Sequence, residues 1–476
     1  MVWLFSLGVV AGVCRSFPLF LGVVLFVLGR AVWLRAAHAW LAVPLGVACG
    51  AIGWMSIERA DLDRRVVTRA AVHADGHAIR LHGWVDGFPQ SGRYGTAFPF
   101  ATTIDGHPVR LWVRAGVFDM AYGESLQLDA VLAASSRTPS AFLTSRGVAG
   151  EARARFDGVR RAPGVHGCPL MREALWPMHR AARTRLARAL GADAALAVGL
   201  LLGERGTLDR PAYEAVRKLG IAHLLALSGM HLTMIAALAL FATRWTPRRR
   251  DGCIALALSL YVGVVGNVDS LTRAYVMALL IIAARALVRP PNPVDALGKA
   301  LFVMLLCAPT ALLSVGLQLS FAATLAVLWC IARMPRWDGA QSTHRAWMRP
   351  LLQSARGAAG AFIVSVAVEV FIAPLQIHHF GRISVVGPFA TVVFLVPVTV
   401  LQAMSLAASF DLPWVGEWIA AALAWASVAT RDAIVVAGAL APDPVELPRV
   451  NWLLYYGAIG IALALIRARG RRHAAP

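Results

Sequence analysis

Apolar runs of bilayer-spanning length recur along this chain and constrain its fold more than any other feature. They fall into two groups, one before residue 58 and one after residue 220. A helix needs about 20 mostly apolar residues to cross a bilayer. The mean hydropathy of +0.62, with 58% hydrophobic residues, is also too high for a soluble domain. We therefore expect a polytopic α-helical membrane protein.

The runs predict about ten to twelve membrane-embedded helices. They are Val2–Val13, Phe17–Leu34, Ala39–Met55, Ile221–Thr243, Cys253–Gly266, Leu271–Val288, Ala296–Ala308, Leu312–Ile331, Ala358–Gln376, Val385–Ala408, Trp414–Ala439 and Trp452–Ile466. Two of them, Cys253–Gly266 and Ala296–Ala308, are short for a full crossing. We expect these two to be re-entrant or half helices, because interrupted helices at membrane depth occur where they line a cavity or are buried in protein.

The formal net charge of +20 lies mostly between the apolar runs. Such a charge fits either the excess of arginine in cytoplasmic loops or an attraction for a polyanion. If every run crosses once, the basic clusters near residues 244–250, 285–299, 333–356 and 467–472 share one side, the cytoplasmic one. The C-terminus is then cytoplasmic and the middle region periplasmic.

The middle region changes character and predicts a small β domain. Apolar and polar residues alternate in AIRLHGWVD, PVRLWVR and ESLQLDAVL, which is typical of strands with one buried face. We predict an inserted small β-barrel, of OB-like type, over residues 58–165. N-terminal membrane helices precede it over 1–57, and an Ala- and Arg-rich amphipathic helical connector follows over 166–220.

The stretch HLLALSGMHLTM, residues 223–234, places polar groups in an otherwise apolar run. Polar residues at membrane depth are costly and mark functional sites by default, although a packed helix can also tolerate them. If the stretch is helical, Ser228 and His231 share one face, and Gly229 permits a kink. This helix face could line a translocation path through the membrane. Alternatively, Ser228 and His231 could serve an intramembrane hydrolase as nucleophile and base. Against a hydrolase, there is no GxSxG elbow and no acidic orienter nearby in sequence.

Several ordered motifs resemble those of the ComEC competence family, inner-membrane proteins that import DNA during natural transformation. The motifs are LGIAHLLALSGMH (219–231), LYVGVVGNVDSLTRAYVMALL (260–280), CAPTALLSVGLQLSFAATLAVL (307–328) and APLQIHHFGRISVVGPFATVVFLVP (373–397). The β region, with its ending TPSAFLTSRGVAG, resembles the family's OB-like domain. The resemblance implies a competence-type transmembrane channel domain over 221–470 that conducts single-stranded DNA from periplasm to cytoplasm, and not an enzyme.

A DNA path needs polar groups in the membrane and a basic, aromatic docking surface outside it. Our candidates for the path are His223, Ser228, Gly229, His231, Arg273, Gln318, Glu369, Gln376, His378, His379 and Arg382. Our docking candidates are Arg80, Arg110, Trp112, Arg114, Arg205, Arg217 and Lys218. Gln318 fits an interhelical hydrogen bond as well as a pore contact, and Glu369 fits an ion pair with a His or Arg or a proton relay. The face of Arg110, Trp112 and Arg114 equally fits an ordinary solvated strand.

The sequence indicates neither a cofactor nor a metal site, because the six cysteines form no CxxC or Cys/His cluster. Many members of the family carry a C-terminal metallo-β-lactamase-like domain. This chain ends at Pro476 with no HxHxDH motif, so we expect no nuclease of that kind. The partners that we expect are single-stranded DNA, membrane lipids, a periplasmic DNA-receptor protein, a separate cytoplasmic motor, since no Walker motif occurs, and a separate nuclease. A non-transporting shortened paralogue is the remaining alternative.

Overall fold

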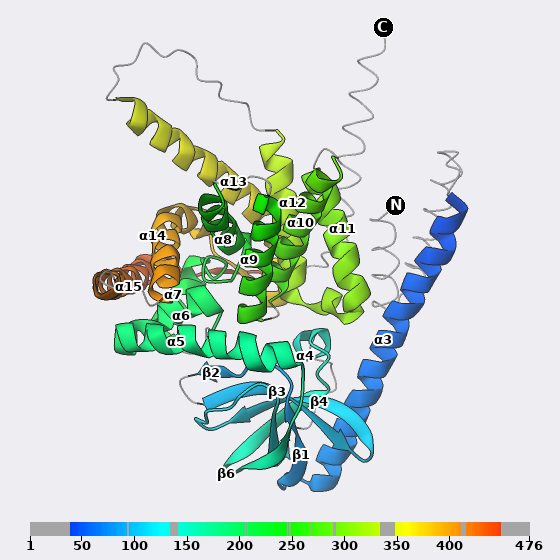
Figure 1. Cartoon of the computed structure of the whole chain (residues 1–476). Helices are drawn as coiled ribbons and strands as arrows, with labels where there is room; N and C mark the ends of the chain where they lie inside the picture. The colour runs from blue at the N-terminus through cyan, green and yellow to red at the C-terminus, as the bar shows by residue number, and fades with distance from the viewer. Residues whose placement is uncertain are drawn as a thin grey trace. The chain divides into compact units, whose positions relative to one another are not determined.

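The computed structural model of the chain (Figure 1) is divided into two compact units, which we describe separately. It describes residues 39–92, 95–133, 141–204, 206, 208–244, 246, 249–266, 268–288, 292–333, 348–410 and 416–448. The expected runs Val2–Val13, Phe17–Leu34 and Trp452–Ile466, and the candidate Arg205, lie outside the described residues. The first unit comprises Met1–Ala212, His223–Leu317 and Pro397–Asp432, and the second comprises Tyr213–Ala222, Gln318–Val396 and Ala433–Pro476.

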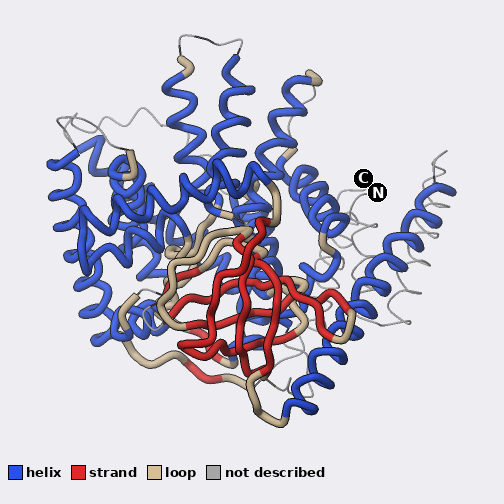
Figure 2. The backbone as a smooth tube through the Cα atoms, turned by 60° about the horizontal axis from the view of Figure 1, so that its bottom comes forward, coloured by secondary structure: helices blue, strands red, loops and turns tan. Residues whose placement is uncertain are grey.

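Helix α3 (Ala39–Ala74) starts in an expected apolar run and continues well beyond it. Near its C-terminal end it presents Val66, Val67 and Ala71 on one face, and these side chains enter the core of the β domain. Residues 58–74, which alternation alone assigns to the β domain, are therefore helical. Figure 2 shows α3 running alongside the strands.

The β domain is a closed barrel of five long strands with one short extra strand. The strands are β1 (Ile79–Val85), β2 (Gln90–Gly92), β3 (Gly95–Ile104), β4 (His107–Ala115), β5 (Glu124–Leu132) and β6 (Gly150–Val165). They follow the order β1-β5-β6-β4-β3-β2, and pairing of β1 with β3 closes the barrel. All long pairs are antiparallel except β4 with β6. This five-stranded closure, with one parallel pair, confirms the predicted small OB-like barrel.

The barrel interior is filled by the alternate residues of each strand. Phe98, Phe100, Leu111 and Leu128 are each completely buried. The closure also depends on Gly83, because a Cβ at this position would lie 2.0 Å from the carbonyl oxygen of Ala101 on β3. Only glycine allows the two backbones this close approach.

Helices of the first unit follow the barrel. They are α5 (Trp176–Leu190), preceded by a π-helical turn at Met171–Leu175, then α6 (Ala194–Leu202), α8 (Gly229–Ala242), α9 (Arg250–Val265), α10 (Asp269–Ala286) and α11 (Pro293–Cys307). Figure 1 shows α5 lying beside the barrel. Helices α8, α9 and α10 share an apolar cluster that includes Leu232, Leu258 and Leu271. Helices α9 and α11, at 16 and 15 residues, are as short as their runs predict.

Long apolar helices dominate the rest of the chain. They are α12 (Val315–Ile331), α13 (Met348–Phe380), α14 (Gly387–Ala408) and α15 (Gly416–Leu440), while α7 (Arg210–Leu219) is short and charged. Within the described residues, Gly357–Phe380, Gly387–Ala408 and Gly416–Leu440 are long and apolar enough to cross a membrane. The chain is therefore a polytopic helical membrane protein with an inserted barrel. Two short strands, β7 (Arg382–Ile383) and β8 (Val445–Glu446), pair in the second unit.

Candidate functional site

The stretch HLLALSGMHLTM does not form one helix, which corrects the expectation that Ser228 and His231 share a helix face. Helix α8 begins at Gly229, and Ser228 is its N-cap in extended conformation. The Ser228 hydroxyl oxygen accepts from the backbone N–H of Met230 at 3.3 Å. In return, the backbone N–H of Ser228 donates to Nδ1 of His231 at 3.1 Å. This is a capping box in which histidine takes the place of the usual Glu or Gln.

His231 is fully buried at this helix start. Its ring also interacts with the backbone of Leu200 on α6. No side-chain acceptor among the described residues hydrogen-bonds Nε2. Because Nδ1 already accepts a backbone N–H, and no acidic group orients the ring, the pair lacks the geometry of a nucleophile and its base. The arrangement builds a helix start and does not favour the hydrolase reading.

Three helix starts meet near this capping box. The Ser270 hydroxyl, in the first turn of α10, donates a short hydrogen bond to the backbone carbonyl of Leu227, just before the cap. Asp269, at the same helix start, accepts a short hydrogen bond from Ser314, which immediately precedes α12. The N-termini of α8, α10 and α12 are therefore linked through polar side chains. Helix N-termini carry partial positive charge and unpaired N–H groups, which favour anions.

Two arginines lie at or near this junction. Arg273, one turn into α10, has 8% of its surface exposed. Arg146, from the segment between β5 and β6, interacts electrostatically with Asp269, and burial lowers the pKa of its guanidinium. Arg146 also lies over the ring of Trp112 on β4, with 5.4 Å between the guanidinium carbon and the ring centroid. Trp112, Arg146 and Asp269 thus connect the barrel to helix α10.

The candidates on α12 and α13 form two separate interactions in the second unit. Gln318 and His379 share a hydrogen bond of 2.8 Å between Oε1 and Nε2, so Gln318 makes the interhelical contact that its residue type suggests. The side chain of Gln376 hydrogen-bonds Glu369 on the same helix. His378 stacks edge-on against His379 with 5.0 Å between ring centroids. Arg382 lies in β7, opposite Glu446 of β8.

The docking candidates on the barrel are paired with acidic neighbours. Arg80 lies 3.1 Å from Asp129, Arg110 lies 2.6 Å from Asp86, and Arg114 lies 3.6 Å from Glu151. Burial raises the pKa of Asp86, an effect that the charge and hydrogen bond of Arg110 oppose. Trp112 is 6% exposed and covered, so its ring is not open for stacking. The alternation of apolar and polar residues along the strands did not predict that these arginines form ion pairs with acidic neighbours.

The remaining candidates lie in or after α7. Arg217 is exposed and lies over the ring of Tyr213 at 5.6 Å. Lys218 forms an ion pair of 3.0 Å with Asp443 in the same unit. His223, in the first unit, is exposed in a turn that precedes the α8 cap.

The sequence analysis did not name two further sets of basic residues as site candidates. Strand β6 carries Arg153, Arg155 and Arg160 on exposed positions, and the run EARARFDGVRR was the available signal. The second set lies on α5, within the predicted Ala- and Arg-rich connector, where the sequence did not predict that His179 contacts Glu204 at 3.0 Å between Nε2 and Oε1. The two residues are 25 positions apart, and no motif links them.

The fold defines a polytopic helical membrane protein with an inserted OB-type barrel. A family model described as "Competence protein" matches residues 200–472. The chain therefore belongs to the competence protein family. No solved structure matches it.

Three relatives show where this chain is similar to characterised and uncharacterised proteins. It is 26% identical to ComE operon protein 3 of Bacillus subtilis over 44% of this chain and 26% of that protein. It is 30% identical to competence protein ComA of Neisseria gonorrhoeae over 43% and 30%. It is 25% identical to an uncharacterized MG316 homolog of Mycoplasma pneumoniae over 54% and 62%. The matched regions thus cover less than two thirds of each relative.

Proposed function

We propose that this protein conducts single-stranded DNA across the inner membrane, from periplasm to cytoplasm, during natural transformation. The observation that carries the proposal is the linked set of helix starts at Ser228, Asp269 and Ser314, inside a region that matches the competence family. Non-helical backbone at membrane depth requires burial in protein or a water-filled cavity. Helix N-termini carry partial positive charge, so linked helix starts suit the passage of an anionic chain.

The barrel has the electrostatics of an outer docking module in this proposal. Three exposed arginines of β6, Arg153, Arg155 and Arg160, have no ion-pair partner among the described residues. OB folds bind oligonucleotides, and basic grooves track the backbone of single strands. The barrel then receives the strand in the periplasm, and Arg146 and Asp269 connect it to the helix starts.

The orientation and partners of the protein follow from the same proposal. The excess of basic residues in the loops supports a cytoplasmic C-terminus and a periplasmic barrel in this proposal. A periplasmic DNA receptor delivers the DNA, a separate nuclease leaves one strand, and a separate cytoplasmic motor pulls that strand inward. The names of the relatives ComE operon protein 3 and competence protein ComA support a role in competence.

Transformation frequency in a deletion strain tests the proposal. We expect complementation with the wild-type chain to restore transformation. Replacement of His231 by Ala should abolish it, because the helix start that it organises is lost. His231→Gln should retain most activity, because a Gln side chain can accept the same N–H. Membrane levels of each variant are measured in parallel. Unchanged transformation in the deletion strain would refute the proposal and favour the non-transporting alternative.

A further inference from the structure

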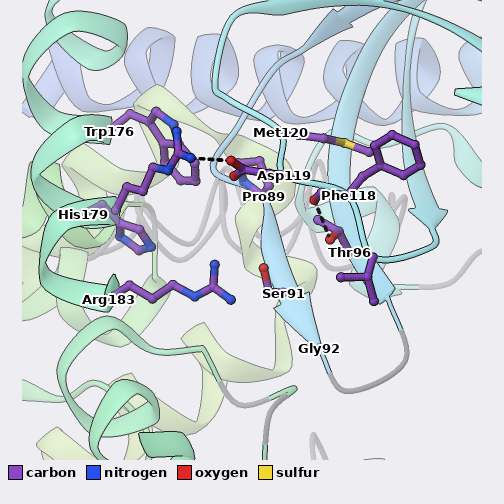
Figure 3. Close-up of a pocket in the computed structure, with 12 residues that line it drawn as sticks. Pro89, Ser91, Gly92, Thr96, Phe118, Asp119, Met120, Trp176, His179 and Arg183 are labelled. Atoms are coloured by element: carbon purple, nitrogen blue, oxygen red, sulfur yellow. Dashed lines mark hydrogen bonds and ion pairs between the residues drawn. The ribbon is translucent and has the colours of Figure 1, made fainter. Parts of the chain in front are cut away.

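A cavity of about 210 Å³ lies between α5 and the barrel, inside the first unit (Figure 3). Helix α5 supplies Trp176, His179, Arg180 and Arg183 to its lining. The barrel supplies the β2 residues Ser91 and Gly92, together with Thr96 and the segment 117–120. In Figure 3 the side chain of Arg183 extends from α5 toward Ser91. The cavity thus has a basic wall formed by α5. The opposite wall, formed by the barrel, presents hydroxyl and backbone groups.

A buried carboxylate holds the basic wall in place. Glu204 is 5% exposed; its Oε2 lies 3.2 Å from Nε of Arg183, and its Oε1 lies 3.0 Å from Nε2 of His179. The other nitrogen of His179, Nδ1, lies 2.8 Å from the carbonyl oxygen of Val264. The ring of His179 is thus held between Glu204 and Val264. The same carboxylate fixes the guanidinium of Arg183 at the cavity wall.

A second arginine of the cavity lining, Arg180, forms an ion pair that another anion could replace. Arg180 forms a short ion pair with Asp119, drawn as a dashed line in Figure 3, and both side chains are more than half exposed. Exposed pairs of this kind contribute little to stability. Asp119 contacts Arg180 through one carboxylate oxygen, in a position that a phosphate oxygen can take. Asp119 is therefore an internal anion that a phosphate group can displace.

Exposed apolar side chains beside the rim indicate which phosphate compound fits. Val117 and Phe118 are 75% and 37% exposed, and both line the cavity. Arginines and an exposed aromatic ring in the lining of one cavity are a combination by which proteins bind single-stranded nucleic acid, with bases stacking on the ring. The cavity lies against an OB-type barrel, a fold that binds oligonucleotides, so the occupant that we infer is a single strand.

We propose that this cavity binds a phosphodiester group of the incoming single strand, through Arg180 and Arg183, with a neighbouring base against Phe118. The proposal rests on the proposed function and specifies where the strand first contacts the protein. Asp119 competes for the same arginine and lowers the affinity. The site holds the strand next to the barrel before it reaches the helix starts of the membrane domain.

Oligonucleotide binding by the purified full-length protein in phosphatidylcholine nanodiscs tests this proposal. Fluorescence anisotropy of a labelled oligo-dT is measured over a series of salt concentrations. We expect Arg180→Gln and Arg183→Gln each to weaken binding about tenfold. Each should also reduce the slope of log K against log salt by about 0.7, the value for one phosphate contact of a single strand. We expect Asp119→Asn to tighten binding, a gain that a merely structural role would not produce.

Matched controls separate the cavity from general charge and from folding. Arg69→Gln removes an exposed arginine of α3 and should leave binding unchanged. The double variant Arg183→Gln/Glu204→Gln keeps the charge balance of the buried group, and should bind as weakly as Arg183→Gln alone. An oligonucleotide with neutral methylphosphonate linkages should bind wild type and Arg180→Gln equally.

The outcomes distinguish this proposal from the proposed function. If the wild type binds but all cavity variants behave like Arg69→Gln, the cavity proposal is wrong and the channel proposal stands. If the wild type does not bind the oligonucleotide at any salt concentration, the channel proposal itself is contradicted. If short-chain phosphatidylglycerol displaces the oligonucleotide from the wild type but not from Arg180→Gln, the cavity takes a lipid headgroup, and the proposal is overturned.

Discussion

Ser228 and His231 form a capping box at the start of α8, and this structural role explains two polar residues in an apolar run. The sequence identified both residues as unusual but predicted the wrong geometry. The familiar capping box has Glu or Gln three positions after the cap. Here the third position after the cap is His231, and apolar residues lie on both sides of the cap. The sequence is therefore typical of a continuous helix and does not indicate a helix start.

A substitution series at Ser228 tests the capping role. Ser228→Ala removes the acceptor for the Met230 N–H and should reduce the free energy of unfolding by about 1 kcal/mol. Ser228→Thr keeps a hydroxyl at the cap and should lose less. Thermal unfolding of the purified variants in detergent measures the difference. Equal stability of Ala and Thr variants would show that the cap does not hold this helix start.

At the scale of the element, alternation predicts strands only where outward and inward residues differ clearly. It found the stretches that form β1, β4 and β5. Strand β3 was missed because Pro99 and small Ala and Thr residues weaken its pattern, and proline within a strand usually argues against one. Strand β6 was missed because its arginine-rich sequence resembles a charged loop. The sequence did not predict that α3 continues to Ala74, because the apolar face of this part of the helix is buried only by packing against the barrel.

Barrel closure depends on glycine at one strand position, and two glycine substitutions test this. Gly83→Ala places a methyl group 2.0 Å from the Ala101 carbonyl oxygen and should disrupt the β1–β3 pairing. Gly106→Ala is the matched change, in a turn where a Cβ meets nothing within 4 Å, although its φ of +80° costs about 1 kcal/mol. Limited proteolysis of both variants reports on the barrel. Equal protease resistance would contradict the close approach of the two strands.

At the scale of the whole molecule, the sequence predicted the class of the protein, because bilayer-length apolar runs have few alternatives in structure. It could not predict which distant polar residues meet. Asp269 and Ser314 are 45 positions apart, and His179 and Glu204 are 25 apart. Such contacts depend on tertiary packing, and neither pair belongs to a local motif. The apolar cluster shared by α8, α9 and α10 brings helices into contact, but periodicity does not specify their register.

The most direct test of the account is where labelled duplex DNA stops in cells that lack this chain. DNA that is protected from external nuclease is compared between periplasm and cytoplasm, in the deletion strain and in the strain complemented with the wild-type chain. The account predicts protected DNA in the periplasm of both strains, and cytoplasmic single strands only in the complemented strain. Cytoplasmic DNA in the deletion strain would contradict it.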